Sequence, residues 1–437
     1  MDCLNTCLDV LREAKLTTRP LVLGCSGGAD STFLLYALSA LHKSSPLDLL
    51  VVHVHHHLRG EEANRDAAFV ETLCGELGFA FCRVDVDVGE EMQKTGEGLE
   101  LCARRLRREA LLSHVKEDGV LLLAHTLDDQ AESVLMHLMR GAGGSGAGGM
   151  APREGHLFRP LLSLRHRDLC QWLREHKKTW CEDKTNHNIA YHRNWVRHEV
   201  LPLLAKNYPR VKEALASFAE LRRDDEVYFE ALLQEERPRL CRNILGVTLI
   251  SSEARLLPSP LRSRLLLGAL REFSWEGWER RHLFLLEEML ERGEGALMLP
   301  HDLLAEGTGE GLWLQEKESS WEKALDVGVV ETPFGVFQVK ESGGEYSAWT
   351  TSWEGVAMSS CVLRPWRRGE RMVLEDGREE KIAKILSDAK IPRPLRARIP
   401  VLCHGDDVLW VVGVRRGGRY QVNQRKQAWE VSCERFF

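Results

Sequence analysis

The sequence lacks the features that mark several large classes of protein. None of its 12 cysteines forms a C-x-x-C pair, the spacing that zinc and iron–sulfur sites usually show. No run approaches the ~20 apolar residues that span a bilayer, and the acidic N-terminus has no apolar core of the kind a secretion signal needs. The net charge is only −6 over 437 residues. We therefore expect a cytoplasmic, globular protein with reduced thiols and no membrane segment.

Charge is distributed unevenly along the chain. Residues 361–437 contain 17 Lys and Arg and 10 Asp and Glu, a net charge of +7, which leaves −13 on residues 1–360. A basic end on an acidic body favours a polyanionic partner at that end. A solvated basic surface would give the same count, so charge alone does not decide between the two.

Short apolar runs alternate with amphipathic stretches in the first third of the chain. This pattern predicts strands at 20–25, 47–54, 79–86 and 119–125, and helices at 31–43, 61–78 and 98–116. Strands that alternate with helices of this length predict an α/β fold with a parallel sheet covered on both faces. Ligands of such sheets bind at the carboxyl ends of the strands.

The rest of the chain predicts a loop and smaller mixed units. The segment GAGGSGAGGM at 141–150 has too many glycines for a helix or a strand, so we expect a mobile loop or lid. Residues 208–235 predict one long charged helix, and the pieces beyond 240 mix helices and strands. The sequence thus predicts a parallel-sheet domain and two smaller C-terminal α+β domains, at 1–207, 208–335 and 355–437.

The strongest local signal is CSGGADS at 25–31, directly after the first predicted strand. Its serine and glycines predict a tight turn whose N–H groups face an anion, at the positive end of the following helix. Asp30 would repel bare phosphate and is better suited to Mg²⁺ that bridges phosphates. Neither the lysine of the G-x-x-x-x-G-K-[ST] loop nor the G-x-G-x-x-G pattern is present. The phosphate site is therefore predicted at Ser26, Gly27, Gly28, Ala29, Asp30 and Ser31.

Two further motifs follow strands at the same predicted sheet edge. HVHHH at 53–57 ends the second strand, and a metal site there is disfavoured because one strand alone carries it and no carboxylate lies at useful spacing. HTLDDQAES at 125–133 follows the fourth strand and places Asp128, Asp129 and Glu132 close together on a helix. Acids so close need a cation or a proton among them, although a helix N-terminus alone also favours acids.

Basic side chains offer candidate phosphate contacts. Arg104 and Arg107 lie on the predicted basic helix, where a solvated surface is the alternative. Arg193 and Arg197, four residues apart, predict a phosphate clamp or else a pair with Glu182 or Asp183. Candidates in the basic end are Arg364, Arg367, Arg368, Lys381, Lys384, Arg393 and Arg396.

The motif SGGxDS after a first strand resembles the PP-loop ATP pyrophosphatase superfamily. The other motifs resemble those of the tRNA(Ile)-lysidine synthetases. His57 stands where that family's H-x-x-H-G-L-R element has glycine, and Ser133 stands where AHxxDDQAET has threonine. Further similar segments are RPLL at 159–162, the E-D-x-[ST]-N…R-N-x-x-R run at 182–197, and the terminal-domain elements at 364–370 and 381–400.

The resemblance implies a fold, a reaction and a set of site residues. The fold is adenine nucleotide alpha hydrolase-like, the cofactors are ATP and Mg²⁺, and the partners are L-lysine and tRNA(Ile) with a CAU anticodon. The reaction joins lysine to C2 of the wobble cytidine through an adenylated cytidine, with release of AMP and diphosphate. The implied ATP-binding residues are Ser26 to Ser31, His53 and His125; the catalytic residues are Asp30, Asp128, Asp129 and Glu132; Asp30 and Asp128 are metal ligands; and the arginines and lysines named above contact tRNA.

Three alternatives stay open at this point. A PP-loop tRNA thiolase usually needs paired cysteines, and none are spaced so. A small-molecule synthetase of the amidotransferase type would not need a basic C-terminal module. A non-catalytic tRNA-binding protein would not need Ser26, Asp30 and Ser31. The residues also leave open which acid holds the metal ion and which the lysine amine.

Overall fold

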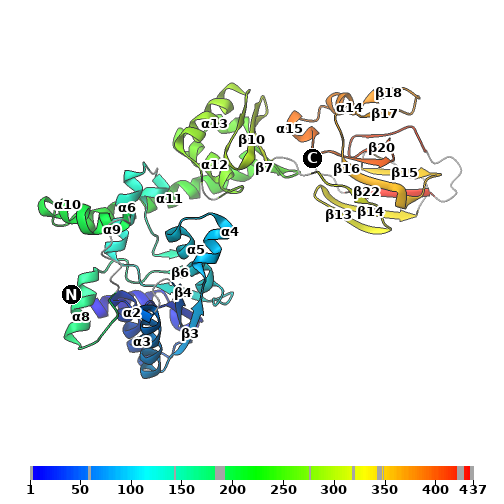
Figure 1. Ribbon diagram of the computed structural model, residues 1–437. Helices are drawn as coiled ribbons and strands as arrows, with labels where there is room; N and C mark the ends of the chain where they lie inside the picture. Colours follow the sequence, from blue (N-terminus) through cyan, green and yellow to red (C-terminus); the bar gives the residue numbers. More distant parts are fainter. Residues whose placement is uncertain are drawn as a thin grey trace. The chain divides into compact units, whose positions relative to one another are not determined.

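The computed structural model describes residues 3–57, 61–141, 144–182, 192–274, 277–316, 320–341, 347, 349–420 and 428–433. The chain divides into two compact units, Met1–Tyr228 and Phe229–Phe437 (Figure 1). The boundary that we expected after residue 207 stays a prediction. The separation of the second unit into two domains stays a prediction.

A six-stranded sheet forms the centre of the first unit. Its strand order is β3-β2-β1-β4-β6-β5. All neighbouring pairs are parallel except β5 with β6. The strands are β1 (Leu21–Gly24), β2 (Leu49–His55), β3 (Ala80–Asp85), β4 (Val120–Leu123), β5 (Arg153–Glu154) and β6 (Leu157–Phe158).

Helices cover both faces of this sheet, as predicted. Successive side chains of a strand point to opposite faces. Leu21 and Leu23 accordingly pack in one cluster with Phe33, and Val22 packs in another with Leu111. The helices are α1 (Cys3–Glu13), α2 (Ala29–Ser44), α3 (Glu61–Leu77), α4 (Val88–Thr95), α5 (Leu99–Leu112), α6 (Leu127–Met139), α7 (Gly144–Ala147), α8 (His166–Glu175), α9 (His192–Trp195) and α10 (Leu201–Asn207).

The glycine-rich segment is not the helix-free loop that we expected. The short helix α7 lies within it. Next to α7, the side-chain amide of Gln130 donates to the Met150 carbonyl at 2.9 Å and accepts from the Met150 N–H at 2.8 Å. A Cβ on Gly149 would lie 2.8 Å from Gln130 Oε1, so the glycine permits this close approach to α6. Tertiary contact therefore outweighs the low helix propensity of these residues.

The long charged helix is confirmed as α11 (Val211–Leu240), which crosses the division between the units. The second unit has helices α12 (Ser259–Arg271), α13 (Arg280–Arg292), α14 (Ile382–Asp388) and α15 (Arg393–Arg396). In the part of the chain that the structure describes, no helix is long and apolar enough to cross a membrane.

Antiparallel sheets make up the rest of the second unit. One has the order β7-β8-β11-β10-β9 and packs against α12 and α13. The others have the orders β12-β16-β19-β20-β21, β13-β14-β22-β15 and β17-β18. A parallel-sheet domain followed by smaller mixed units confirms the predicted α/β fold class. The strands are β7 (Cys241–Ile244), β8 (Val247–Ser251), β9 (Ala296–Met298), β10 (Leu303–Thr308), β11 (Gly311–Glu316), β12 (Lys323–Ala324), β13 (Gly328–Thr332), β14 (Gly335–Glu341), β15 (Thr350–Glu354), β16 (Cys361–Pro365), β17 (Arg371–Val373), β18 (Glu379–Lys381), β19 (Pro400–His404), β20 (Asp407–Val411), β21 (Arg415–Arg416) and β22 (Ala428–Cys433).

Candidate active site

A cleft of about 1050 Å³ opens at the carboxyl ends of β1, β2 and β4. This is the edge at which ligands of parallel α/β sheets bind. The two motifs that follow β1 and β4 meet here because these strands are neighbours in the sheet. The predicted residues that line the cleft are Ser26, Gly28, Ala29, Asp30, Ser31, His53, Arg104, Arg107, His125, Asp128, Asp129, Glu132, Arg193 and Arg197.

The turn after β1 has the geometry of an anion-binding loop. Gly27 has φ +86°, a left-handed conformation that glycine adopts at little cost. Its carbonyl accepts hydrogen bonds from Thr32 Oγ1 at 3.1 Å and from the Cys181 N–H at 2.9 Å. The hydroxyls of Ser26 and Ser31 lie 3.3 Å apart, in front of the first turn of α2. The loop thus presents hydroxyls and a helix N-terminus to the cleft.

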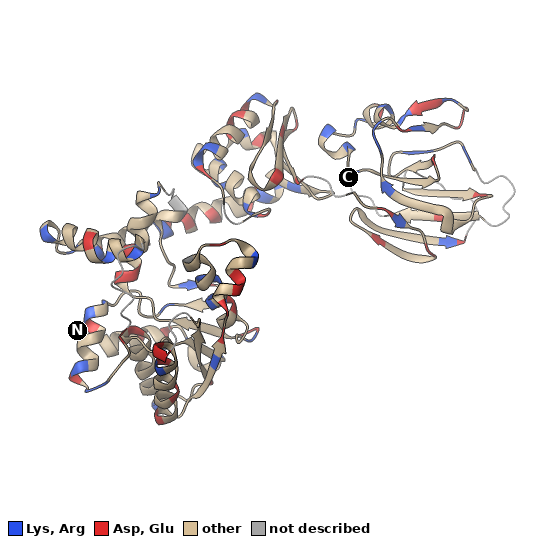
Figure 2. Cartoon of the chain, in the orientation of Figure 1, with Lys and Arg blue, Asp and Glu red and all other residues tan. Residues whose placement is uncertain are grey.

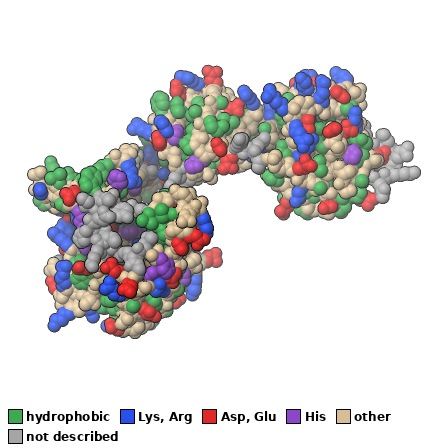
Figure 3. Space-filling view, in the orientation of Figure 1, with side chains coloured by type: hydrophobic (Ala, Val, Ile, Leu, Met, Phe, Trp, Pro, Cys, Tyr) green, Lys and Arg blue, Asp and Glu red, His purple; other side chains and the backbone are tan. Residues whose placement is uncertain are grey.

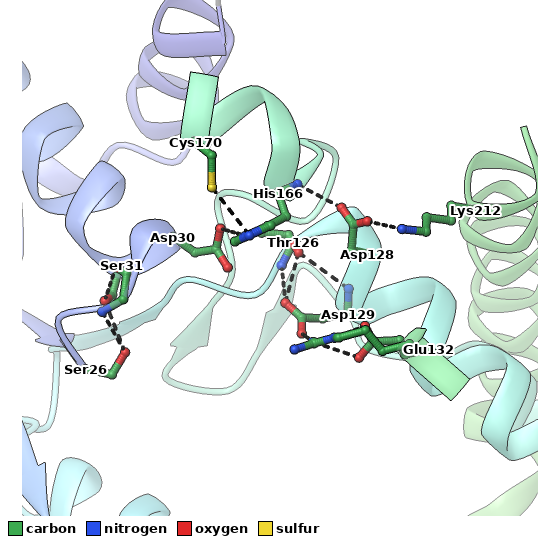
Figure 4. Close-up of polar contacts among 12 residues, drawn as sticks. Ser26, Asp30, Ser31, Thr126, Asp128, Asp129, Glu132, His166, Cys170 and Lys212 are labelled. Carbon is green, nitrogen blue, oxygen red and sulfur yellow. Dashed lines mark hydrogen bonds and ion pairs between the residues drawn. The ribbon is translucent and has the colours of Figure 1, made fainter. Parts of the chain in front are cut away.

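A histidine that the sequence did not reveal links Asp30 to Asp128. His166 Nδ1 lies 2.7 Å from Asp30 Oδ1, and the backbone N–H of His166 donates to Asp128 Oδ2 at 2.8 Å (Figure 4). The hydrogen bond to the Asp30 carboxylate raises the pKa of His166 to about 10. Burial raises the pKa of Asp30 above its ordinary value, and the hydrogen bond from His166 offsets only part of that rise. The 2.7 Å contact and the raised pKa of His166 place a proton between the imidazole and the carboxylate.

The pH dependence of stability tests this pairing. Because the pKa of His166 is raised from 6.5 to about 10, its stabilising effect is complete below pH 6.5 and is lost as pH rises through 10. The side chain is 52% exposed, so solvent screens the pair and we expect a loss of only about 1 kcal/mol. Denaturant unfolding between pH 7 and 10 should show this loss in wild type and a flatter profile in His166→Gln. His176→Gln, at the end of the same helix, is the control, and identical profiles for wild type and His166→Gln would refute the pairing.

The acids on α6 are neutralised by the chain's own arginines. Glu132 is only 1% exposed and contacts Arg193 Nε at 2.8 Å and Arg197 Nε at 2.5 Å. Asp129 contacts both guanidinium groups as well, at 2.9 and 3.1 Å, and completes a capping box with Thr126. Burial opposes ionisation of Asp129, but Arg193 and its other partners lower its pKa. We expected a cation or a proton among the acids, and the cations are these two guanidinium groups.

Asp128 is placed differently from the other two acids. Lys212 Nζ lies 2.5 Å from Asp128 Oδ1, where it forms an ion pair at the rim of the cleft. The side chains of Asp128 and Lys212 are 18% and 36% exposed. A carboxylate at this edge of the cleft therefore already binds a primary ammonium group. Sequence patterns did not point to Lys212, because it lies more than eighty positions from its partner.

Two histidines at the cleft are held neutral. His53 is buried, and its Nδ1 lies 2.9 Å from the Cys25 carbonyl oxygen. Burial lowers the pKa of His53 and lowers that of His125 to about 4. Among the described residues, the buried Nδ1 of His125 has no hydrogen-bond partner. A polar ligand group in the cleft would satisfy this atom.

The remaining predicted residues separate into two groups. Arg104 and Arg107 are exposed on α5 and face the cleft. The candidates in residues 361–437 belong to the second unit. Arg364 differs from the other candidates because it is 6% exposed and forms an ion pair with Glu370 at 2.6 Å. Asp183 and Arg59, which contributed to the family resemblance, lie outside the described residues.

Comparisons with known proteins agree with this architecture. A PP-loop domain model matches residues 5–204, and a TilS substrate C-terminal domain model matches residues 361–433. Proteins named tRNA(Ile)-lysidine synthase from Geobacter sulfurreducens and Alkalilimnicola ehrlichii are each 30% identical to the chain, over 94% of it and 92% of their own lengths. One from Thermus thermophilus is 40% identical over 68% of this chain and 56% of its own length.

Fold, cleft and family models together define an enzyme with a PP-loop ATP-binding domain. In this domain the serine–glycine turn before α2 and the acids after β4 meet in one cleft at the edge of the parallel sheet. The chain belongs to the tRNA(Ile)-lysidine synthase family.

Proposed function

We propose that this chain is a carbon–nitrogen ligase that joins L-lysine to C2 of the wobble cytidine of tRNA(Ile) with a CAU anticodon. ATP supplies the energy, and AMP and diphosphate leave. The observation that carries the proposal is the convergence, in one cleft, of the Ser26–Ser31 turn and a carboxylate, Asp128, that binds a primary ammonium group. A PP-loop thiolase would need paired cysteines, and the family assignment does not favour it.

The turn and Asp30 are suited to ATP with Mg²⁺. The hydroxyls of Ser26 and Ser31 and the N-terminus of α2 provide donors for phosphate oxygens. Among the described residues, only one oxygen of Asp30 is hydrogen-bonded, so the other suits a hard cation. Both oxygens of Asp128 have partners, which makes Asp30 the better ligand of the two acids that we predicted. A Mg²⁺ ion held there would neutralise charge on the phosphates.

The first step activates the cytidine. Its C2 carbonyl oxygen attacks the α-phosphorus of ATP, an oxygen–phosphorus bond forms, and diphosphate leaves with the electron pair of the broken bond. The chain holds the triphosphate at the Ser26–Ser31 turn. Arg104 and Arg107 lie on the wall of the cleft and supply positive charge for the phosphates of the nucleotide or of the tRNA.

The second step requires the lysine ε-amine as a free base. Asp128 is the carboxylate that we assign to this amine, because Lys212 already occupies it as an ammonium group would. The incoming substrate lysine displaces Lys212 from Asp128. Asp128 accepts one proton from the ε-ammonium group of the substrate, and the resulting amine attacks C2. The bond between C2 and the adenylate oxygen breaks, and AMP leaves.

Asp129 and Glu132 act as positioning residues in this mechanism. Both carboxylates form ion pairs with Arg193 and Arg197. The four side chains hold α6 against the segment that follows α8, and so fix the position of Asp128 in the cleft. We keep the clamp role of the two arginines as a proposal. Their Nε and Nη2 groups contact the acids, and among the described residues their Nη1 groups remain to bind a phosphate that enters the cleft.

The substrate requirement for diphosphate release tests the proposed function. ATP is supplied with tRNA, lysine, glutamine or cysteine, singly and together. We expect release with tRNA(Ile) of the CAU anticodon, and turnover to AMP and modified tRNA only when lysine is also present. Release that depends on glutamine or cysteine, or that needs no tRNA, would replace this function with one of the alternatives.

The basic C-terminal part of the chain is proposed to bind the tRNA backbone. Arg367 and Arg393 are 68% and 82% exposed, and Arg368 and Lys381 are exposed as well. Figure 2 marks the Lys and Arg positions along this part of the chain, and Figure 3 shows their side chains on its surface. Phosphate contacts position a nucleic acid without specifying its sequence. Arg364 is excluded from this group because it is buried against Glu370.

Neutralising three of these arginines should weaken the binding of all tRNAs to the same extent. We expect the triple Gln variant at positions 367, 368 and 393 to lose affinity equally for matched and mismatched tRNAs. Its salt dependence should flatten by about one unit of slope for each lost contact. Filter binding over a salt series measures both effects. The control for the change in net charge is a triple Gln variant of Arg12, Lys43 and Arg65, which are exposed on the first unit. If the variant at positions 367, 368 and 393 keeps the wild-type salt dependence, these arginines do not contact tRNA.

A further inference from the structure

The ends of β2 and β3 bring together two histidines and an aspartate that sequence spacing did not connect. We disfavoured a metal site at residues 53–57 because one strand alone carried the histidines and no carboxylate lay at useful spacing. The structure adds a second strand and a carboxylate, because β2 and β3 are parallel neighbours in which His55 pairs with Asp85. In the part of the chain that is described, these residues and His57 are the one group of His, Cys, Asp and Glu whose ligand atoms all lie within 4.8 Å of one another.

The three side chains converge on one point. His57 Nε2 lies 2.9 Å from Asp85 Oδ1, and His55 Nδ1 lies 3.5 Å from the same oxygen. Ligand atoms bound to one zinc ion at about 2.0–2.1 Å lie about 3.3 Å apart when the geometry is tetrahedral. The observed distances are therefore close to those that a bound ion requires, before any rearrangement.

Hydrogen bonding indicates which ring nitrogen of His55 lacks a proton. Its Nδ1 accepts a hydrogen bond from the His57 backbone N–H at 3.3 Å, so this nitrogen carries a lone pair. That lone pair lies near the ionised carboxylate of Asp85, whose pKa is lowered by Arg83 and by the two histidines. A cation bound between His55 Nδ1 and Asp85 Oδ1 would replace this hydrogen bond and offset the charge of the carboxylate.

The backbone of His57 gives independent support. Its φ is +54°, in the left-handed region where residues other than glycine are uncommon. Strained conformations persist where surrounding contacts enforce them, and they gather at functional sites. Here the strain places an imidazole, which glycine would lack, against Asp85. Because this conformation suits glycine, His57→Gly removes the imidazole without disturbing the turn.

We propose that His55, His57 and Asp85 form a binding site for a divalent transition-metal ion of the zinc type. Imidazole and carboxylate are the ligands that zinc takes in proteins, and water fills the fourth position. Arg83 contacts Asp85 Oδ1 at 2.7 Å and orients the carboxylate from outside, as a partner of a metal ligand does. Its positive charge also weakens the site. Because His55 lines the cleft as well, the bound ion ties the end of β2 to the wall of the active site.

Metal titration of the full-length protein without nucleotide tests the site. Zn²⁺ affinity is measured by competition with a chromophoric chelator, and Co²⁺ is added separately to read the ligand set from its visible spectrum. We expect wild type to bind one more Zn²⁺ ion than His57→Gly or Asp85→Asn does. If a variant still binds this ion, its affinity should be at least about tenfold lower, since loss of even a residue that only orients a metal ligand costs that much. His176→Gln should match wild type.

The Co²⁺ spectrum separates this site from the cysteines. A tetrahedral nitrogen–oxygen site gives visible ligand-field bands without the sulfur-to-cobalt charge transfer of a thiolate site. Loss of those bands in His57→Gly, with an unchanged melting temperature in the absence of metal, would support the assignment. Equal Zn²⁺ stoichiometry and affinity in wild type, His57→Gly and Asp85→Asn would overturn it and leave the three residues as a hydrogen-bonded cluster.

Discussion

Asp30→Ala should lower tRNA-dependent diphosphate release by about a hundredfold or more while the protein stays folded. The carboxylate is the proposed ligand of the ion that neutralises the phosphates, and loss of one preorganised electrostatic contact costs about that much. The fold should survive because Asp30 contacts His166 at the cleft and does not belong to an apolar cluster. Diphosphate release in single turnover measures the effect on the first step.

Two further variants separate chemistry from structure at this position. Asp30→Asn keeps a hydrogen-bond acceptor for His166 but lacks the charge, so it should lose diphosphate release as Asp30→Ala does. Asp168→Asn, an exposed acid on the neighbouring helix α8, should retain wild-type activity. Near-wild-type diphosphate release by folded Asp30→Ala would remove Asp30 from the site.

Glu132→Gln should destabilise the first unit by about 3 kcal/mol. The change leaves Asp129 as the remaining partner of Arg193 and Arg197, and breaking a buried ion pair on one side costs roughly 3–5 kcal/mol. For a unit of this size the loss corresponds to a fall in Tm of about 6–12 °C. Calorimetry of the full chain measures the shift, and hydrogen exchange on residues 127–139 assigns it to α6.

A double-mutant cycle tests whether the loss arises in the arginine cluster. Arg193→Ala in the Glu132→Gln background should cost less than Arg193→Ala alone, because the partner is already missing. Glu199→Gln, an exposed acid on the segment that carries Arg197, should change Tm little. If Glu132→Gln keeps the wild-type Tm and only slows lysine transfer, Glu132 acts on substrate, and the positioning role is wrong.

Local sequence determined the elements that meet at the cleft. The turn at Ser26–Ser31 and the acids of α6 each follow a buried strand, and strand–helix alternation predicts that these strands lie parallel in one sheet, with their carboxyl ends at one edge. The parallel sheet and the shared edge could therefore be predicted before any contact was known. The same reasoning predicted the long charged helix α11, because charge pattern and length are local properties.

Partners that are distant in sequence could not be predicted in this way. His166 contacts Asp30 across more than one hundred positions, and Lys212 reaches Asp128 from the first turns of α11. Neither residue stands in a recognisable motif, so no spacing rule relates it to its partner. Asp85 was missed for the same reason, since its link to His55 depends on strand register. In the glycine-rich segment, local propensity predicted a loop, and packing against Gln130 produced α7 instead.

The nucleoside at the wobble position of tRNA(Ile) reports most directly on the proposed function. Unmodified tRNA with a CAU anticodon is incubated with the protein, ATP, Mg²⁺ and lysine, then digested to nucleosides for mass spectrometry. The wobble cytidine should gain the mass of one lysine less one water, with one AMP released for each modified tRNA, and tRNA with a different anticodon should be unchanged. A wobble cytidine of unchanged mass after ATP has been cleaved to AMP and diphosphate, or a sulfur-containing product in its place, would contradict the proposed function.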